Sequence, residues 1–224
     1  MSQGRSSYSL DFGSDYIQYI EMPAANPPAN PRGRPREFDL EEALDRAIPL
    51  FCSGGFHGTS LNDLADGMQL TQGSIYKAFK DKRQLFFAAL DRQEEFYADR
   101  LRTALDEAGS GHEKLRVALL FYAGLATGSE GMQGCLVVTT AVELAASDRS
   151  VARRVSHSFR RRQKFLAELI YQGHNDGSIP THVDSEGTAW MMLFLFQGLR
   201  VVGKTGISRK QLTKAVEAAM KTLR

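Results

Sequence analysis

Residues 56–90 read FHGTSLNDLADGMQLTQGSIYKAFKDKRQLFFAAL and contain two short helical patterns separated by a turn. Ser60 begins the first pattern, and Asp63 follows three residues later, which is the spacing of a capping box. Gly67 ends this pattern after barely two turns, and Thr71 is the expected N-cap of the second. The stretch therefore predicts two consecutive short helices with a tight connection.

The second of these helices has one apolar and one polar face. At about 100° per residue, Ile75 and Phe79 share one side, whereas Gly73, Lys77 and Lys80 lie on the other. The major groove of B-DNA, about 12 Å wide, admits one helix if its outer face is polar and a partner helix holds its inner face. Such a pair is typical of a helix-turn-helix. The expected buried side comprises Leu61, Leu64, Met68, Leu70, Ile75 and Phe79, over Leu44, Ile48, Phe51 and Phe56 of the preceding helix.

A helix is also expected before this pair. Asp39 can cap it and Gly54-Gly55 ends it, with apolar residues recurring at intervals of three and four between them. Pro49 lies inside this span and lacks the amide that would bond the Asp45 carbonyl, at a cost on the order of 3 kcal/mol. We therefore expect a kink or an interruption at Pro49.

The rest of the chain shows helical rather than strand periodicity. A long helix is expected from Asp81 to about Ala108, and further helices at 112–127, 132–146, 148–173, 184–203 and 208–223. The predicted fold is all-α, with an N-terminal three-helix helix-turn-helix domain at 37–82 and a C-terminal helical domain at 83–224. Residues 1–36 contain PAANPPANPRGRP and are expected to form a flexible tail.

Composition narrows the class of protein. The 224 residues are 42% hydrophobic and 24% charged, with a net charge of +2, as in ordinary globular proteins. The longest uncharged apolar stretch, 117–126, is far short of the roughly 20 residues of a membrane span. Asp11 and Asp15 stand where a secretory leader would be apolar, and Cys52 and Cys135 form no disulfide framework. The expected location is the cytoplasm.

The stretch from Glu37 to Leu90 resembles the DNA-binding domain of TetR-family transcriptional regulators. The resemblance rests on the GGF that ends the first helix, the TSL that starts the next, Gly73, the aromatic pair Tyr76 and Phe79, and Lys82 leading into Leu85 and Phe86. Pro49 departs from the family pattern. The C-terminal part resembles the family in layout, and GCLVVTTAVELA at 134–145 resembles a segment of one branch.

The resemblance and the face pattern together imply a set of DNA contacts. Hydroxyls, lysines and free helix amides suit phosphate oxygens, and Gly73 would let the backbone approach the bases closely. The expected phosphate contacts are Thr59, Ser60, Tyr76, Lys80 and Lys82, and the expected groove-facing residues are Thr71, Gln72, Gly73, Ser74 and Lys77. Arg34 and Arg36 are expected to reach the minor groove as an arm. The alternatives are a core role for Tyr76 and a solubilising role for the two arginines.

The C-terminal domain is expected to bind a small-molecule effector and to form a homodimer. The helix at 184–203 is apolar almost all round, and with 148–173 it resembles the family's dimer edge, which would place two recognition helices on a palindromic operator. An intramolecular core is the alternative. The candidate effector pocket comprises Phe121, Cys135, Trp190 and Phe194, although core packing explains these residues equally well.

Three further features have two interpretations each. Cys135 is either a sensor or a small buried hydrophobe. The basic run at 149–164 is either a second nucleic-acid contact or the solvated face of an amphipathic helix, and the second is favoured. His174, Asp176, His182 and Asp184 either bind a metal or belong to a surface turn, and we predict no metal and no cofactor.

The predicted function is a ligand-responsive transcriptional regulator, most simply a repressor, and not an enzyme. The sequence contains no G-x-S-x-G, H-E-x-x-H, Walker A or G-x-G-x-x-G motif. The alternatives are a small helical enzyme acting on an apolar substrate and an architectural DNA-binding protein without an effector.

Overall fold

The structure is a computed structural model that describes residues 38–224, and all regular elements in this range are helices, as predicted. The predicted tail and its arginines, Arg34 and Arg36, lie outside the described residues. No helix between residues 38 and 224 is long and apolar enough to cross a bilayer. The helices are α2 (Leu40–Gly58), α3 (Leu61–Met68), α4 (Gln72–Phe79), α5 (Lys82–Leu105), α6 (Gly111–Gly124), α7 (Gly128–Gln133), α8 (Leu136–Leu144), α9 (Arg149–Asp176), α10 (Ser185–Gly203), α11 (Arg209–Met220) and the 3-10 turn η1 (Lys221–Leu223).

The predicted N-caps of the first four helices are confirmed. The Asp39 carboxylate accepts from the Glu41 and Glu42 amides at 2.8 and 3.2 Å. Ser60 forms the expected capping box at the start of α3, Thr71 accepts from the Ser74 amide at 3.1 Å, and Asp81 accepts from the Gln84 amide at 2.8 Å. Each cap satisfies helix amides that have no intrahelical partner, which is why these helices begin where they do.

The break in α2 is at Gly55 and not at Pro49, so the predicted kink at Pro49 is wrong. Gly55 has φ 68° and ψ −173°, whereas Pro49 continues the helix. Pro49 lies on the exposed side of α2, where the freed Asp45 carbonyl can be hydrated, and this lowers the cost of the missing hydrogen bond. Gly55 adopts a left-handed φ that only glycine reaches without strain.

The helix predicted at 132–146 is α8, which begins only at Leu136, and a separate short helix, α7, precedes it. Gly134, with φ 91°, separates α7 from α8, and Cys135 becomes the N-cap residue of α8. The other C-terminal helices lie close to their predicted spans, except that α5 ends at Leu105 and α9 continues to Asp176.

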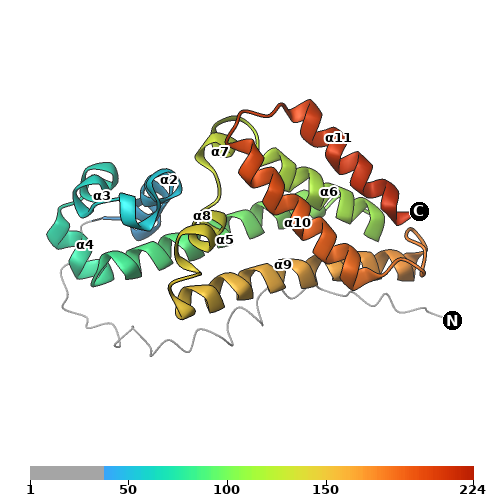
Figure 1. Cartoon of the computed structure of the whole chain (residues 1–224), viewed down its shortest axis with the longest axis horizontal. Coiled ribbons are helices and arrows are strands. Elements are labelled where there is room, and N and C mark those ends of the chain that lie inside the picture. The colour runs from blue at the N-terminus through green and yellow to red at the C-terminus, as the bar shows by residue number, and fades with distance from the viewer. Residues whose placement is uncertain (1–37) are drawn as a thin grey trace. The chain divides into compact units, whose positions relative to one another are not determined.

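Helix α5 belongs to both halves of the described chain. Along its length, α5 packs first against α2 and α4 and then against α6 and α8. Figure 1 shows it running from the α3 and α4 end toward α6. In the first half, the Phe86 ring of α5 meets Phe51 and Phe56 edge-on at 4.9 and 5.2 Å. A second core is built from α5, α6, α9, α10 and α11, so α5 joins the two cores mechanically.

One contact between sequence-distant segments holds the broken end of α2. The Glu143 carboxylate of α8 accepts from the Phe56 and His57 amides, each at 2.7 Å. These amides follow the Gly55 break and have lost their helical acceptors. A side chain at Gly55 would collide with the same carboxylate.

We expect Gly55→Ala to lower the free energy of unfolding by about 1–3 kcal/mol, because it adds left-handed strain and displaces Glu143. Equilibrium denaturation at a fixed protein concentration measures this. Gly58→Ala is the matched control, since a methyl group there meets no atom within 4 Å, and it should change the value by less than about 1 kcal/mol. Equal effects of the two substitutions would contradict the role given to Gly55.

Candidate nucleic-acid interface

Helices α3 and α4 are fixed by apolar residues on their inner sides. Leu64 and Met68 of α3, and Ile75 and Phe79 of α4, are buried. The turn between the helices is closed by Gln69, which adopts a left-handed conformation with φ 58° and ψ 41°. The burial leaves the opposite face of α4 toward solvent, as the spacing predicted.

A residue that the sequence pattern does not single out holds this turn in place. Arg46 of α2 donates to the Gln69 side chain at 2.8 Å and approaches the Met68 carbonyl at 3.4 Å. It also pairs with Glu42 at 2.6 Å. No local pattern signals this role, because Arg46 lies more than 20 residues before the turn.

The outer face of α4 is polar and open. Thr71, Gln72, Gly73, Lys77 and Lys80 are exposed. Ser74 is half-buried, and its hydroxyl lies 3.0 Å from that of Thr71. The Gln72 amide donates to Asn62 of α3, which orients it across the pair of helices.

Gly73 has no structural reason to be glycine. A Cβ there would meet only the Thr71 hydroxyl, at 3.8 Å, and its φ lies outside the left-handed region. Glycine inside a helix costs about 1 kcal/mol relative to alanine. The exposed face of α4 thus lacks a side chain at Gly73. The fold does not require this absence, whereas a partner that approaches the backbone closely would.

Tyr76 is 46% exposed, so its ring is not a core aromatic. Lys80 ends α4 with φ 65°, and its amide donates to the Tyr76 carbonyl at 2.9 Å. Both side chains stand next to the exposed face of α4, where a phosphate backbone could meet them.

Two predicted phosphate contacts have intramolecular partners. Thr59 is buried, and its hydroxyl donates to the Gly55 carbonyl at 2.7 Å. The Lys82 ammonium donates to the Phe56 and Thr59 carbonyls at 2.7 and 3.0 Å and lies 4.4 Å from the centre of the Phe56 ring. Both residues complete the end of α2. Ser60 is exposed, although the Asp63 carboxylate accepts from its amide and therefore competes with an anion there.

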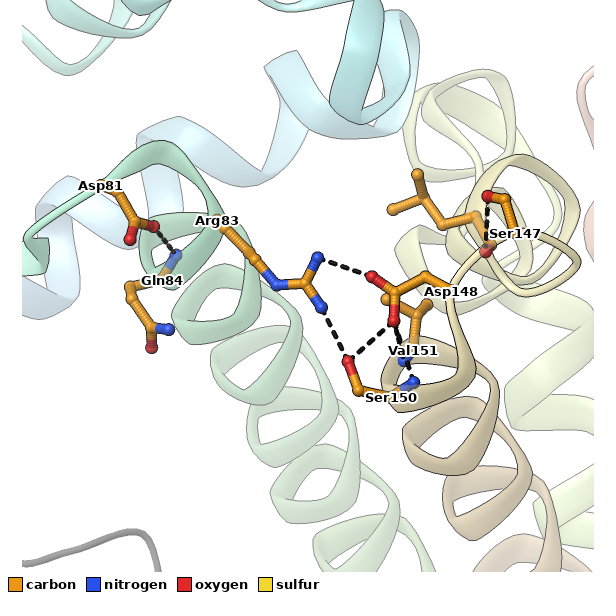
Figure 2. A network of polar contacts seen from close by, with 8 residues as sticks. Asp81, Arg83, Gln84, Ser147, Asp148, Ser150 and Val151 are labelled. Atoms are coloured by element: carbon orange, nitrogen blue, oxygen red, sulfur yellow. Dashed lines mark hydrogen bonds and ion pairs between the residues drawn. The ribbon is translucent and has the colours of Figure 1, made fainter.

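Polar contacts tie the helix-turn-helix to the C-terminal helices. Arg83, at the start of α5, donates to Asp148 at 2.6 Å and to Ser150 at 2.7 Å, at the start of α9 (Figure 2). The Arg83 guanidinium beside it, together with the Ser150 hydroxyl, holds the pKa of Asp148 well below its usual range. A cavity of about 180 Å³ lies beside this network, lined by residues of both halves, including Phe56, Phe87 and Leu144.

The four predicted effector residues differ in burial and in their ring contacts. Cys135 is buried. Trp190 and Phe194 stack on each other at 5.7 Å, but Phe194 is 65% exposed. Phe121 packs beside Tyr122 and under Arg100, and within residues 38–224 no ring contact joins it to the Trp190–Phe194 pair.

The predicted turn residues near the end of α9 act in capping. Asp176 accepts from the Gly111 amide at 2.7 Å, and Asp184 caps α10. The part of the chain that the structure describes holds no group of three or more histidine, cysteine or acidic side chains suited to a metal ion.

Two family models match the N-terminal and C-terminal parts of the chain separately. Residues 43–89 match the family model described as bacterial regulatory proteins, tetR family, and residues 111–221 match a tetracyclin repressor-like C-terminal domain. The chain is 29% identical over 192 residues to the transcriptional repressor ComR of Escherichia coli K12, covering 84% of this chain and 88% of ComR. It is 30% identical over 137 residues to the uncharacterized regulator YezE of Bacillus subtilis 168, covering 61% of this chain and 69% of YezE.

One solved structure is similar to this chain over nearly the whole length of the solved chain. It is a cysteine mutant of the TetR family regulator CifR in complex with a 26-base-pair operator DNA. The identity is 31% and the TM-score 0.75, and the match covers 84% of this chain and 98% of the CifR chain.

We expect Asp148→Asn to remove a pH-dependent part of the stability. A carboxyl group whose pKa is lowered by folding stabilises the native state above its unfolded pKa of about 3.9 and loses that contribution as the pH falls. The difference in unfolding midpoint between the native protein and the variant should therefore be largest above about pH 5 and should shrink toward pH 3. Asp66→Asn, which makes the same change in charge at an exposed residue of α3, is the control.

Proposed function

Because the chain belongs to the TetR family of transcriptional regulators, we propose that it is a homodimeric repressor that binds a palindromic operator through α4 and is released by a small effector. The DNA-binding part comprises residues 37–82, and the effector-binding and dimerisation part comprises residues 83–224. A cytoplasmic location accords with access to DNA.

The bare backbone at Gly73 carries the proposal most directly. A glycine that the fold does not need, in the first turn of a helix with an exposed polar face, fits close approach to a duplex. A solvated helix face without a partner would gain stability from alanine at this position.

The proposed contacts divide into two groups. Thr71, Gln72, Gly73, Ser74 and Lys77 face the groove, and Ser60, Tyr76 and Lys80 face phosphates. Thr59 and Lys82 are not in this set, because their polar groups bond the end of α2. We propose that Arg34 and Arg36 contact the adjacent minor groove.

The proposed dimer surface is the exposed apolar face of α9 and α10. It contains five large side chains that the single chain leaves uncovered, namely Tyr171, Met191, Phe194, Val201 and Val202. An exposed apolar patch of this kind marks a contact with another protein surface. Two copies related by a two-fold axis would cover it and would place two α4 helices on a two-fold symmetric site.

The proposed transmission of the effector signal uses contacts already described. Helix α5 is shared by both halves, and Glu143 and Asp148 bond the helix-turn-helix from α8 and the start of α9. A coupling free energy of about 1–3 kcal/mol would change operator affinity roughly 5- to 150-fold. Loss or rearrangement of a few such bonds supplies energies of this size.

We take the protein as a regulator and not as an enzyme, since the family evidence concerns transcription. An architectural DNA-binding role would give binding without preference for sequence. Selection of bound fragments from genomic DNA tests this directly: enrichment of one palindrome supports the repressor, and equal recovery of all fragments supports the architectural alternative.

We expect Lys80→Ala to weaken binding to every duplex and to reduce the slope of log affinity against log salt by about one unit, because one phosphate contact is lost. Gln72→Ala and Lys77→Ala should instead change which base is preferred at one operator position, at about 1–3 kcal/mol. Fluorescence anisotropy with the selected operator measures both. Lys210→Ala, an equal change in charge on exposed α11, is the control. An unchanged slope in Lys80→Ala would contradict the placement of α4.

We expect Phe194→Glu to convert the dimer to a monomer at micromolar concentration, because it places a charge in the proposed apolar interface. Sedimentation equilibrium gives the mass. Val142→Glu introduces the same charge at the 81% exposed Val142 of α8 and should leave the mass unchanged. A dimer that survives Phe194→Glu would exclude this surface.

A further inference from the structure

The Arg200 side chain is a buried cation with an unused donor. Arg200 is 5% exposed, and its Nη2 donates to the Gly134 carbonyl at the α7–α8 break. Its Nη1 is buried and has no hydrogen-bond partner, and the guanidinium lies 5.9 Å from the centre of the Tyr97 ring. No carboxylate of residues 38–224 forms an ion pair with it.

A buried guanidinium without a counter-ion is unfavourable, because it has lost its hydration and gained no opposite charge. A water molecule could accept from Nη1 but would not neutralise the charge. A fold that needed only packing at this position would be served as well by an apolar side chain. The arrangement therefore points to an anion that the chain itself does not provide.

Two glutamates of the C-terminal half pair with other arginines. Glu94 pairs with Arg162 at 3.1 Å and with Arg161 at 3.4 Å, so one carboxylate already serves two cations. Glu130 pairs with Arg100 at 2.5 Å.

The buried thiol and phenol groups near Arg200 keep their protons. Burial raises the pKa of Cys52 to about 11 and that of Tyr97 to about 12, so both groups are neutral at physiological pH. Neither can act as the counter-ion of Arg200.

Other positive groups surround the same point. Gly134 and Cys135 lie at the N-terminus of α8, where the dipole favours a negative charge, although the Leu136 amide already donates to the Gln93 side chain at 3.0 Å. Lys204, one turn after Arg200 on α10, donates to the Cys52 carbonyl at 3.3 Å and has no carboxylate partner in the described residues. Arg200 and Lys204 thus bring two cationic side chains without a carboxylate partner among residues 38–224 beside Gly134.

We propose that the C-terminal domain binds a small organic carboxylate, with Arg200 Nη1 as its principal ligand, at the junction of α7, α8 and α10. Because Nη1 is sealed from solvent, binding requires a local opening around it. This inference rests on the proposed effector role of the domain and assigns the effector a chemical class. Binding beside Gly134 would act on α8, whose other end carries Glu143 and its bonds to α2.

The test uses the full-length protein without DNA, at constant ionic strength set with sodium chloride. Propionate, lactate and benzoate at 10 mM are compared with propionamide, lactamide and benzamide by thermal unfolding and calorimetry. At least one carboxylate should raise Tm by 2 °C or more and bind at least tenfold more tightly than its amide. The Arg200→Gln variant should lose this preference, and Arg116→Gln, which alters an exposed arginine of α6, should keep it.

A second variant guards against a folding defect in Arg200→Gln. Arg200→Met removes the charge and keeps an unbranched, flexible apolar side chain, so its Tm without ligand should equal or exceed that of the native protein, and carboxylates should not raise it. The proposal is overturned if carboxylates and amides act alike on the native protein, or if carboxylates stabilise the Arg200 variants as well. Operator binding is measured separately on the same samples, so failure of the carboxylate site leaves the repressor assignment intact, and failure of operator binding leaves the carboxylate result intact.

Discussion

The two hydrogen bonds from the Phe56 and His57 amides to Glu143 constrain the rest of the molecule. Helix α2 must break at Gly55 for these amides to point outward, and α8 must lie close enough to present its carboxylate. The break in turn places the carbonyls that Lys82 and Thr59 bond, so the start of α5 is fixed by the same geometry. One acidic side chain from the C-terminal half therefore helps to set where the helix-turn-helix stands on its connecting helix.

Local sequence was sufficient for the DNA-binding half. Capping residues, glycine punctuation and the three-and-four spacing of apolar residues all act within one or two turns, and they gave α3, α4 and the buried pair Ile75 and Phe79. The features that the sequence missed depend on long-range contacts. The contacts of Arg46 with the turn, of Glu143 with the end of α2 and of Lys82 with the same end join residues that no local spacing relates, whereas the Thr59 hydroxyl bonds the Gly55 carbonyl only four residues away.

The two errors in helix boundaries have one origin. Proline was given its average cost, although the cost depends on which side of the helix the freed carbonyl faces, and Pro49 is on the exposed side. Gly134 was given no weight, although its left-handed φ divides α7 from α8 and brings its carbonyl to Arg200. At Pro49 the tertiary environment decided the outcome, whereas at Gly134 the glycine permits the left-handed conformation and the tertiary environment selects it. Size and polarisability likewise did not predict that Cys135 is buried and Phe194 exposed.

The length of α5 turns small changes at one end into useful displacements at the other. Its 24 residues make a rod of about 36 Å at 1.5 Å per residue. Pivoting such a rod by about 5° carries its tip roughly 3 Å, close to the 3.4 Å step between neighbouring base pairs. In a two-fold dimer both α5 helices would move in this way. The distance between the two α4 helices would then no longer match the helical repeat of the duplex.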